Sequence, residues 1–316
     1  MKKSIAVLLV LLTALCVFAG GSKEKTETYT VGVCQFVQHV ALDAATQGFQ
    51  DALVEELGDK VVFDIQNASG EVPNCSTIVN SLVSKNVDLI MANATPALQA
   101  AASATATIPV LGTSVTHYAP ALDIDNWTGT VGTNVSGTSD LAPLDEQAKM
   151  ILEWFPTAKK VGLLYCSAEA NSVYQIEEVE KYLADMGVTT QMFSFTDTND
   201  IASVTQRACE QSDVIYIPTD NTAAANTEAI ANIVYVTKTP VIAGEAGICS
   251  GCGVATLSIS YYDLGVTTGK MAAKILKGEA DVSTMPIEYT SVTKQYNPDM
   301  CAYLGITPLA GYEAIN

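Results

Sequence analysis

The sequence predicts an α/β protein built from two doubly wound, Rossmann-like lobes. Apolar strands and amphipathic helices alternate over residues 29–113, the pattern breaks into turn-forming residues between Ser114 and Asp140, and the alternation then restarts. Alternation of this kind builds parallel sheets covered by helices. The 316 residues, 48% of them hydrophobic, are enough to fill two cores. We therefore expect two similar lobes with a cleft between them.

Each expected strand is a short apolar run, and each expected helix repeats apolar residues three or four positions apart. The strands of the first lobe are YTVGVCQF (29–36), VVFDIQNA (61–68), DLIMANA (88–94) and PVLGT (109–113). Those of the second lobe are KVGLLYC (160–166), VTTQMFSF (188–195), DVIYIP (213–218) and PVIAG (240–244). Helices are expected between them, for example over residues 42–57 and 222–236.

The last part of the chain predicts how the lobes are joined. Residues 145–250 already supply a sheet and its helices, so a piece of the remaining chain should return to the first lobe. We assign residues 29–139 plus 253–280 to the N-terminal lobe, and residues 140–252 plus 281–316 to the C-terminal lobe. The chain then crosses between the lobes three times, and these crossings form a hinge.

The N-terminus has the features of a signal peptide over residues 1–19: two lysines, an apolar run and small residues up to Ala19. The alternative is a lipid anchor on Cys16. The apolar run is shorter than the ~20 residues that a membrane-spanning helix needs. Residues 20–28 are expected to be a solvated tether. We therefore expect the protein outside the cytoplasmic membrane, in the periplasm or at the cell surface.

The charge balance disfavours some partners. A formal net charge of −18 repels nucleic-acid backbones and anionic lipid, so we expect no nucleic-acid binding. Arg207 is the single arginine, and it lies in an expected helix away from any strand end. We expect it at the surface. An anionic ligand group must therefore be held by hydroxyls, backbone N–H groups or helix N-termini.

Enzyme and metal signatures are missing. There is no G-x-S-x-G, H-E-x-x-H, P-loop or G-x-G-x-x-G after a strand, and His39 and His117 are the only histidines. We predict no catalytic residue, no metal and no cofactor. Cys249 and Cys252 are expected to form a local disulfide or to remain two free thiols in a Gly-rich loop. A secreted enzyme that uses two carboxylates is the alternative from another class.

Polar residues at the expected strand ends indicate a binding site. In open α/β sheets, ligands bind outside the carboxyl ends of the strands. The candidate ligand-binding residues are Gln35, Phe36, Asn67, Thr95, Thr113, Ser114, Ser167, Asn171, Ser172, Asp220, Asn221 and Glu245. Several are also ordinary helix N-cap residues, but together they build a wall of donors that suits a carboxylate. His39 is either a polar contact in the cleft or an exposed loop residue.

Five segments carry a resemblance to a known family. They are QHVALDAATQGFQDAL (38–53), ATPALQAAASAT (94–105), GLLYCSAEANSVYQIEE (162–178), IPTDNTAAAN (217–226) and SYYDLGVTTGKMAAKILKGE (260–279). With these, the chain resembles the extracellular substrate-binding proteins of ABC importers of the type I periplasmic-binding fold, in the subfamily of tryptophan- and other aromatic-amino-acid-binding lipoproteins. Val40 and the segment over residues 112–129 depart from the family pattern.

The resemblance implies a protein that binds a small L-amino acid, tryptophan, phenylalanine or tyrosine, and docks on an ABC permease without catalysis. For an amino acid, we expect the ligand carboxylate on Thr95, Thr113 and Ser114, with Asn171 and Ser172 reaching across the cleft. Asp220 is the candidate partner of the ligand ammonium, and its alternative role is that of a helix cap alone. Phe36 is expected to stack on an aromatic side chain. The alternative function is a secreted ligand sensor of the same fold.

Overall fold

The computed structural model describes residues 28–315. The predicted signal peptide, most of the tether and the candidate lipid site at Cys16 lie outside the described residues. Within the described part of the chain, no helix combines the length and the apolar character that crossing a membrane requires.

The first lobe is a six-stranded sheet with the order β11-β5-β4-β3-β1-β2. Its strands are β1 (Tyr29–Gln35), β2 (Val61–Asn67), β3 (Leu89–Asn93), β4 (Val110–Val115), β5 (Val135–Ser139) and β11 (Glu288–Tyr289), and all of its pairings are parallel. Its helices are α2 (Val40–Leu57), α3 (Val72–Ser84), α4 (Thr95–Ala104), α5 (Tyr118–Ala121) and α12 (Tyr261–Leu276), with short 3-10 turns at Gly58–Lys60 and Val282–Thr284. Two apolar clusters fill the lobe: α3 and α4 contribute to one and α2 and α12 to the other.

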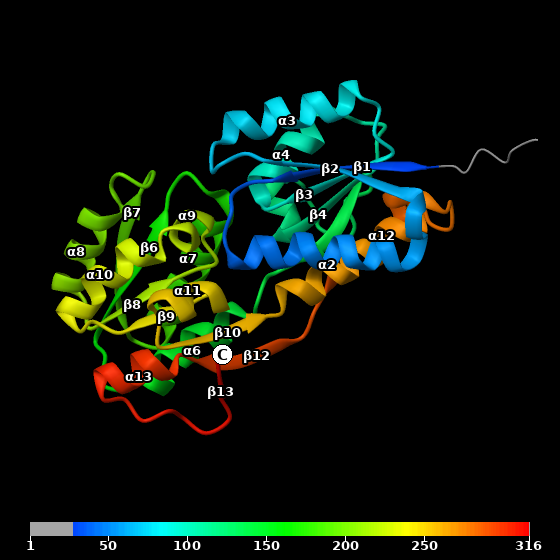
Figure 1. The fold of residues 1–316 in the computed structure, drawn as a ribbon. Helices are drawn as coiled ribbons and strands as arrows, with labels where there is room; N and C mark the ends of the chain where they lie inside the picture. Colours follow the sequence, from blue (N-terminus) through cyan, green and yellow to red (C-terminus); the bar gives the residue numbers. More distant parts are fainter. Residues whose placement is uncertain (1–27, 316) are drawn as a thin grey trace, which may run out of the picture.

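The second lobe is a seven-stranded sheet with the order β13-β12-β10-β9-β8-β6-β7. Its strands are β6 (Lys160–Cys166), β7 (Thr189–Phe195), β8 (Val214–Ile217), β9 (Val241–Ala243), β10 (Ala255–Ile259), β12 (Val292–Tyr296) and β13 (Glu313–Ala314). Its helices are α6 (Leu144–Trp154), α7 (Ala170–Asp185), α8 (Ile201–Gln211), α9 (Asn221–Ala225), α10 (Thr227–Thr237), α11 (Ala246–Cys252) and α13 (Pro298–Leu304). Figure 1 shows the two lobes side by side. The predicted fold class is confirmed.

The chain crosses between the lobes three times: from β5 to α6, from β10 to α12, and from β11 to β12. The predicted lobe boundaries need correction at two places. Strand β10 pairs with β9 and β12 and so belongs to the second sheet, although we had assigned residues 253–280 together to the first lobe. The segment over residues 282–289 belongs to the first lobe, because β11 pairs with β5. Strand pairing decides both cases, and local apolar patterns carry no information about the partner strand.

Helices α2 and α12 pack along each other beside the junction of the lobes (Figure 1). A Cβ atom at Gly265 would overlap the carbonyl oxygen of Ala45, and one at Gly48 would overlap that of Tyr262. Only glycine permits so close an approach of two helix backbones. Helix α12, which follows the second crossing, is therefore fixed to α2, which begins at the cleft.

Two predicted elements differ in the structure. The turn-rich stretch between Ser114 and Asp140 contains strand β5, whose sequence VSGTS is too small and polar to give an apolar pattern. The predicted Gly-rich loop around Cys249 and Cys252 is helix α11, and both cysteines are buried free thiols. The Glu245 side chain stabilises this helix by capping its N-terminus.

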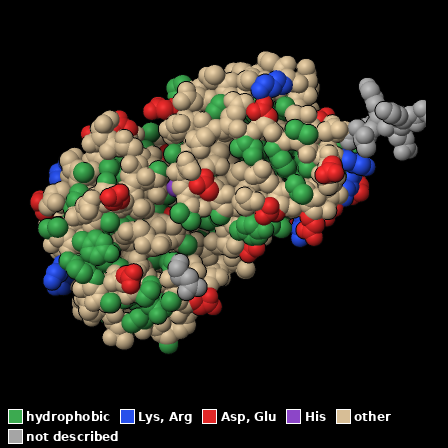
Figure 2. All heavy atoms as spheres, in the orientation of Figure 1, with side chains coloured by type: hydrophobic (Ala, Val, Ile, Leu, Met, Phe, Trp, Pro, Cys, Tyr) green, Lys and Arg blue, Asp and Glu red, His purple; other side chains and the backbone are tan. Residues whose placement is uncertain are grey.

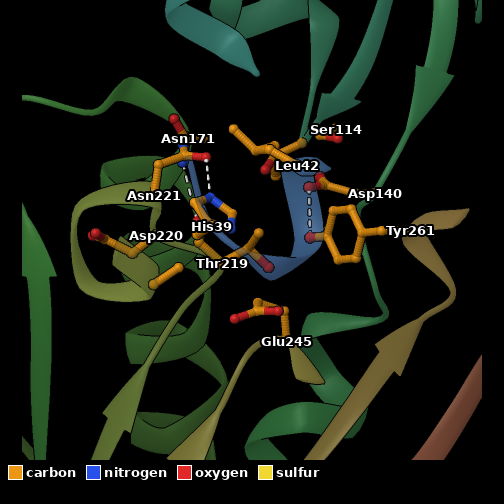
Figure 3. Close-up of a pocket in the computed structure, with 12 residues that line it drawn as sticks. His39, Leu42, Ser114, Asp140, Asn171, Thr219, Asp220, Asn221, Glu245 and Tyr261 are labelled. Carbon is orange, nitrogen blue, oxygen red and sulfur yellow. Dashed lines mark hydrogen bonds between the residues drawn. The ribbon is translucent and has the colours of Figure 1, made fainter. Parts of the chain in front are cut away.

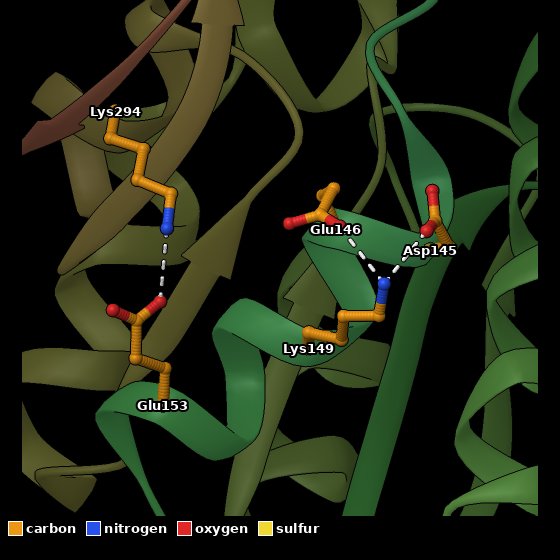
Figure 4. Close-up of polar contacts among 5 residues, drawn as sticks. All are labelled: Asp145, Glu146, Lys149, Glu153 and Lys294. Atoms are coloured by element: carbon orange, nitrogen blue, oxygen red, sulfur yellow. Dashed lines mark hydrogen bonds and ion pairs between the residues drawn. The ribbon is translucent and has the colours of Figure 1, made fainter.

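Strand β12 is joined to helix α6, near the third crossing, by an ion pair between Lys294 and Glu153 at 3.3 Å (Figure 4). Lys149 bridges Asp145 and Glu146 on the same helix at 2.9 Å each. These pairs are exposed, and such pairs contribute about 0–1 kcal/mol. Figure 2 shows acidic side chains spread over the face in view rather than gathered in one patch.

Candidate functional site

A small cavity lies between the lobes, at the carboxyl ends of the central strands, as the sequence predicted. Its lining residues are His39, Leu42, Ser114, Thr116, Asp140, Asn171, Thr219, Asp220, Asn221, Ala224, Glu245 and Tyr261. We call it the central cavity. Figure 3 shows these side chains converging from both lobes, with Tyr261 at the start of α12. A ligand bound here would touch both lobes and the second crossing.

The lobes are closed over the central cavity. Its volume is about 10 Å³, which has room for roughly one water molecule. Across the cleft, His39 Nε2 lies 3.3 Å from Asn221 Oδ1, and the rings of His117 and Tyr174 are 5.2 Å apart in an edge-to-face arrangement. A solute can therefore enter only when the lobes part.

Several buried polar atoms around the cavity have no hydrogen-bond partner among the described residues. They are Thr95 Oγ1, Ser114 Oγ, Asp140 Oδ1 and Asn171 Oδ1. An unpartnered buried polar atom costs roughly 1–3 kcal/mol, so native structures rarely keep several in one place without a function. Ser114 also has a positive φ of 53° at an irregularity of β4, and backbone strain of this kind clusters at binding sites.

Asp140 follows β5 at the first crossing and is 4% exposed. Its Oδ2 accepts a hydrogen bond of 2.9 Å from the Tyr261 hydroxyl, while Oδ1 is unpartnered. Burial raises the pKa of Asp140 to about 6, and the Tyr261 hydroxyl opposes the shift. The Thr116 hydroxyl lies near enough to the carboxylate to lower the pKa as well, but it makes no hydrogen bond of normal geometry to Oδ1. Asp140 thus presents one unused carboxylate oxygen to the cavity, and a cationic group there would lower its pKa again.

Two further buried carboxylates, Asp220 and Glu245, have all their oxygens occupied. Asp220 accepts from the backbone N–H groups of Cys166 at 2.6 Å and Ala223 at 2.8 Å, and Glu245 accepts from those of Gly247 and Ile248. Burial, and for Asp220 also the nearby Glu169, raises the pKa of each to about 7. Both act as helix caps in this structure, which was the alternative role considered for Asp220.

The cavity contains no basic side chain that would compensate these acids. His39 is the one imidazole among the lining residues, and burial lowers its pKa. Asn221 Nδ2 donates to Glu169 Oε2 at 2.6 Å, so Asn221 Oδ1 is the acceptor that faces His39. The neutral imidazole therefore carries its proton on Nε2. The negative potential of the cavity favours a ligand with an ammonium group.

Five of the twelve predicted site residues line the central cavity. They are Ser114, Asn171, Asp220, Asn221 and Glu245. Thr95 lies in a small neighbouring pocket that Asn171 also lines. Thr113 and Ser172 are fully buried behind the wall, where Thr113 contacts Thr138 at 3.3 Å and Ser172 accepts from Asn171 at 3.3 Å. These residues support the cavity wall.

Four other predicted residues lie elsewhere. Phe36 lines a larger cavity between the lobes. Gln35 is used within the first lobe, where it donates to Asp43 at 2.7 Å and accepts from Thr46 at 2.6 Å. Asn67 and Ser167 are exposed; Asn67 accepts from Ser69 N at 2.7 Å within its own turn, and Ser167 donates to Phe195 O at 3.2 Å at the end of β7. Neither residue lines the central cavity.

Asp140 and Tyr261 line the central cavity but are not among the residues predicted from the sequence, although both follow strands. Asp140 follows β5, which the apolar pattern does not reveal, and Tyr261 entered only as part of the segment over residues 260–279 that carries the family resemblance. An acid directly after a polar Gly-Thr-Ser stretch was the available signal. His39, considered as a possible cleft contact, does line the cavity.

Arg207 is exposed on α8, where its guanidinium donates a hydrogen bond of 3.4 Å to Ser203 O. The prediction of a surface position is confirmed. We expect Arg207→Ala to change ligand affinity by less than about twofold, because a tenfold change needs about 1.4 kcal/mol and Arg207 lies outside the central cavity. Titration calorimetry measures the affinity. A loss of affinity above tenfold would contradict the prediction that an anionic ligand group is bound without arginine.

A closing pair of α/β lobes around a polar cavity defines a solute-binding protein. Residues 30–308 match the family model for ABC transporter substrate binding proteins, and the chain belongs to this family. It is 30% identical over 282 residues to a tyrosine-binding protein of Clostridioides difficile (strain R20291), covering 87% of this chain and 81% of the relative.

Two solved structures resemble this one to different degrees. The ABC domain from Streptococcus pneumonia in complex with L-Trp is 34% identical with a TM-score of 0.86, covering 91% of this chain and 100% of the other. The ligand-free, open structure of a substrate binding protein from Clostridium difficile is 33% identical but has a TM-score of 0.69, covering 92% and 99%. Since the identities are alike, the difference supports a closed arrangement of the lobes here.

Proposed function

We propose that this protein captures an L-amino acid with an aromatic side chain between its lobes and delivers it to the permease of an ABC importer. The ligand ammonium binds Asp140. The ligand carboxylate binds the hydroxyls of Ser114 and Thr95 and the first turns of α4 and α7, where helix N-termini favour negative charge.

One observation carries this proposal. The unpartnered, buried Asp140 Oδ1 lies in the same cavity as the unpartnered oxygens of Ser114 and Asn171, which belong to different lobes. The ammonium group of a zwitterionic ligand offers donors to the Asp140 carboxylate, and its carboxylate offers acceptors to the hydroxyls. Such a ligand contacts both lobes across the cleft. No residue that lines the central cavity is lysine or arginine, so a ligand with negative charge alone is disfavoured.

The aromatic class rests on two relatives. One is named a tyrosine-binding protein, and the other was solved with L-Trp. The family consists of substrate-binding proteins rather than enzymes. In this proposal, residues 1–19 act as a signal peptide or Cys16 carries a lipid, and the closed protein docks on a permease outside the cytoplasmic membrane.

The direct test is calorimetry of the protein, unfolded and refolded to remove bound solute, with L-tryptophan, L-tyrosine, L-phenylalanine, L-leucine and L-glutamate. We expect the aromatic amino acids to bind at least tenfold more tightly than the others. Mass spectrometry of natively purified protein should find one of them. Tight binding of a sugar or nucleoside, with no amino acid bound, contradicts the proposal.

Binding should also change the overall shape. Because a ligand that contacts both lobes favours the closed state by its differential affinity, we expect the radius of gyration of the ligand-free protein to exceed that of the saturated protein. Small-angle X-ray scattering with and without ligand measures this difference. An unchanged radius would show that the lobes do not part in solution.

A further inference from the structure

A second and larger cavity lies between the lobes beside the central one. It has a volume of about 330 Å³, within the range of about 300–1,000 Å³ typical of ligand pockets. From the first lobe, Phe36, Val37 and residues 69–73 line it; from the second lobe, Cys166, Glu169, residues 196–198 and α9 do. We call it the Phe36 cavity.

The two cavities share a wall. On α9, Asn221 and Ala224 face the central cavity, whereas Thr222 and Ala225 face the Phe36 cavity. Glu169 lines the Phe36 cavity and accepts a hydrogen bond of 2.6 Å from Asn221. On the first lobe, Phe36 packs in the same apolar cluster as Leu42, which lines the central cavity. Asn221 and Glu169 therefore form part of the partition between the two cavities.

Volume decides where a ligand side chain can lie. The central cavity, at about 10 Å³, has room for roughly one water molecule and must widen to admit the ligand head group, so it leaves no room for a side chain as well. The neighbouring pocket of Thr95, His117 and Tyr174 is equally small, at about 10 Å³. Among the pockets that adjoin the central cavity in the described part of the chain, the Phe36 cavity has the volume for an aromatic ring.

Building on the proposed function, we propose that the Phe36 cavity is the subsite for the ligand side chain and sets the specificity of the protein. The His39 to Asn221 contact opens to admit the side chain, which then lies between Phe36 and α9. Phe36 is 3% exposed and offers a ring at a fixed position, which favours an aromatic partner.

The charged residues that line the Phe36 cavity indicate which polar group the tip of the ligand side chain carries. Its acidic lining residues are Glu71, Glu169 and Asp197, and its lining contains no lysine or arginine. Both oxygens of Glu169 already accept from Asn221 and Thr222, so Glu71 and Asp197 are the acids that a ligand can reach. Carboxylates accept hydrogen bonds and repel anions. The subsite therefore fits an aromatic ring that carries a donor, such as a phenol or an indole N–H, and it rejects an acidic side chain.

The experiment fills the cavity from its solvent side. Ala225 is exposed, so Ala225→Phe should fold normally while its ring occupies the subsite. The control is Ala202→Phe, the same change at an exposed position of α8. We expect Ala225→Phe to weaken L-tryptophan and L-tyrosine at least tenfold by calorimetry, while L-alanine binding and the affinities of the control change less than threefold.

Phe36→Leu gives a second, independent readout, because it keeps an apolar side chain but removes the ring. It should lower the preference for L-tryptophan over L-leucine at least threefold. If the wild-type protein binds aromatic amino acids and both Ala225→Phe and Phe36→Leu bind them equally well, the subsite is wrong and the proposed function stands. If the wild-type protein binds no amino acid, both proposals fail.

Discussion

Asp140→Asn should weaken binding of an aromatic amino acid by roughly 30-fold or more. Removing one partner of a desolvated charge pair typically costs about 2–5 kcal/mol, and 2 kcal/mol corresponds to about 30-fold. The asparagine keeps the size of the side chain and can still accept from the Tyr261 hydroxyl. Because it also removes a buried charge, the ligand-free protein should melt at the same temperature or higher. Calorimetry and thermal melting measure the two effects.

The matched control is Asp220→Asn, the same substitution at the other aspartate that lines the central cavity. Both Asp220 oxygens accept from backbone N–H groups, so an amide there must turn its NH2 toward a donor. Leaving a buried group unsatisfied costs about 1–3 kcal/mol, and the melting temperature should fall with less effect on affinity. If instead Asp220→Asn weakens binding 30-fold and Asp140→Asn binds normally, Asp220 is the ammonium partner, as the sequence suggested.

Ligand affinity should fall as the pH decreases below about 6. The pKa of Asp140 is raised to about 6 by burial, and an ammonium binds its ionised form. Below that pH the side chain must first lose a proton, so the affinity falls by up to tenfold per pH unit. Calorimetry between pH 5 and 8 measures this slope. The pH dependence of the affinity should be weaker in Asp140→Asn. An equally steep pH dependence in that variant would show that another group titrates.

Without ligand, the closed arrangement of the lobes should show the opposite trend in stability. Asp140, Asp220 and Glu245 all have pKa values raised by burial, so the folded state binds more protons than the unfolded state between pH 4 and 7. Their protonated forms stabilise the fold fully below the unfolded-state pKa values, and this stability is lost as the pH rises through about 6–7. We therefore expect the contribution of these three groups to stability, measured by thermal melting, to decrease from pH 5 to 7.5.

Local patterns predicted most of the sheet because buried parallel strands are continuous apolar runs. KVGLLYC is β6 without a change of boundary, and DLIMANA contains β3. The same reasoning predicted polar residues at strand ends, of which Ser114 and Asn171 line the central cavity. It failed for β5, whose residues are small and polar and whose burial comes from its neighbours. Asp140 was therefore not recognised.

By itself, the sequence determined the alternation of strands and helices, the two lobes with three crossings, the edge of the sheets where polar residues gather, and the lack of a second arginine. Each depends on residue type and on spacing along the chain. Tertiary structure alone decided that β10 joins the second sheet, that Asp220 accepts a hydrogen bond from Cys166 N while Asp140 Oδ1 has no partner, and that Phe36 faces a separate cavity. These depend on which groups meet in the folded chain, for example across the 54 residues between Cys166 and Asp220, and such contacts leave no periodic signal in the sequence.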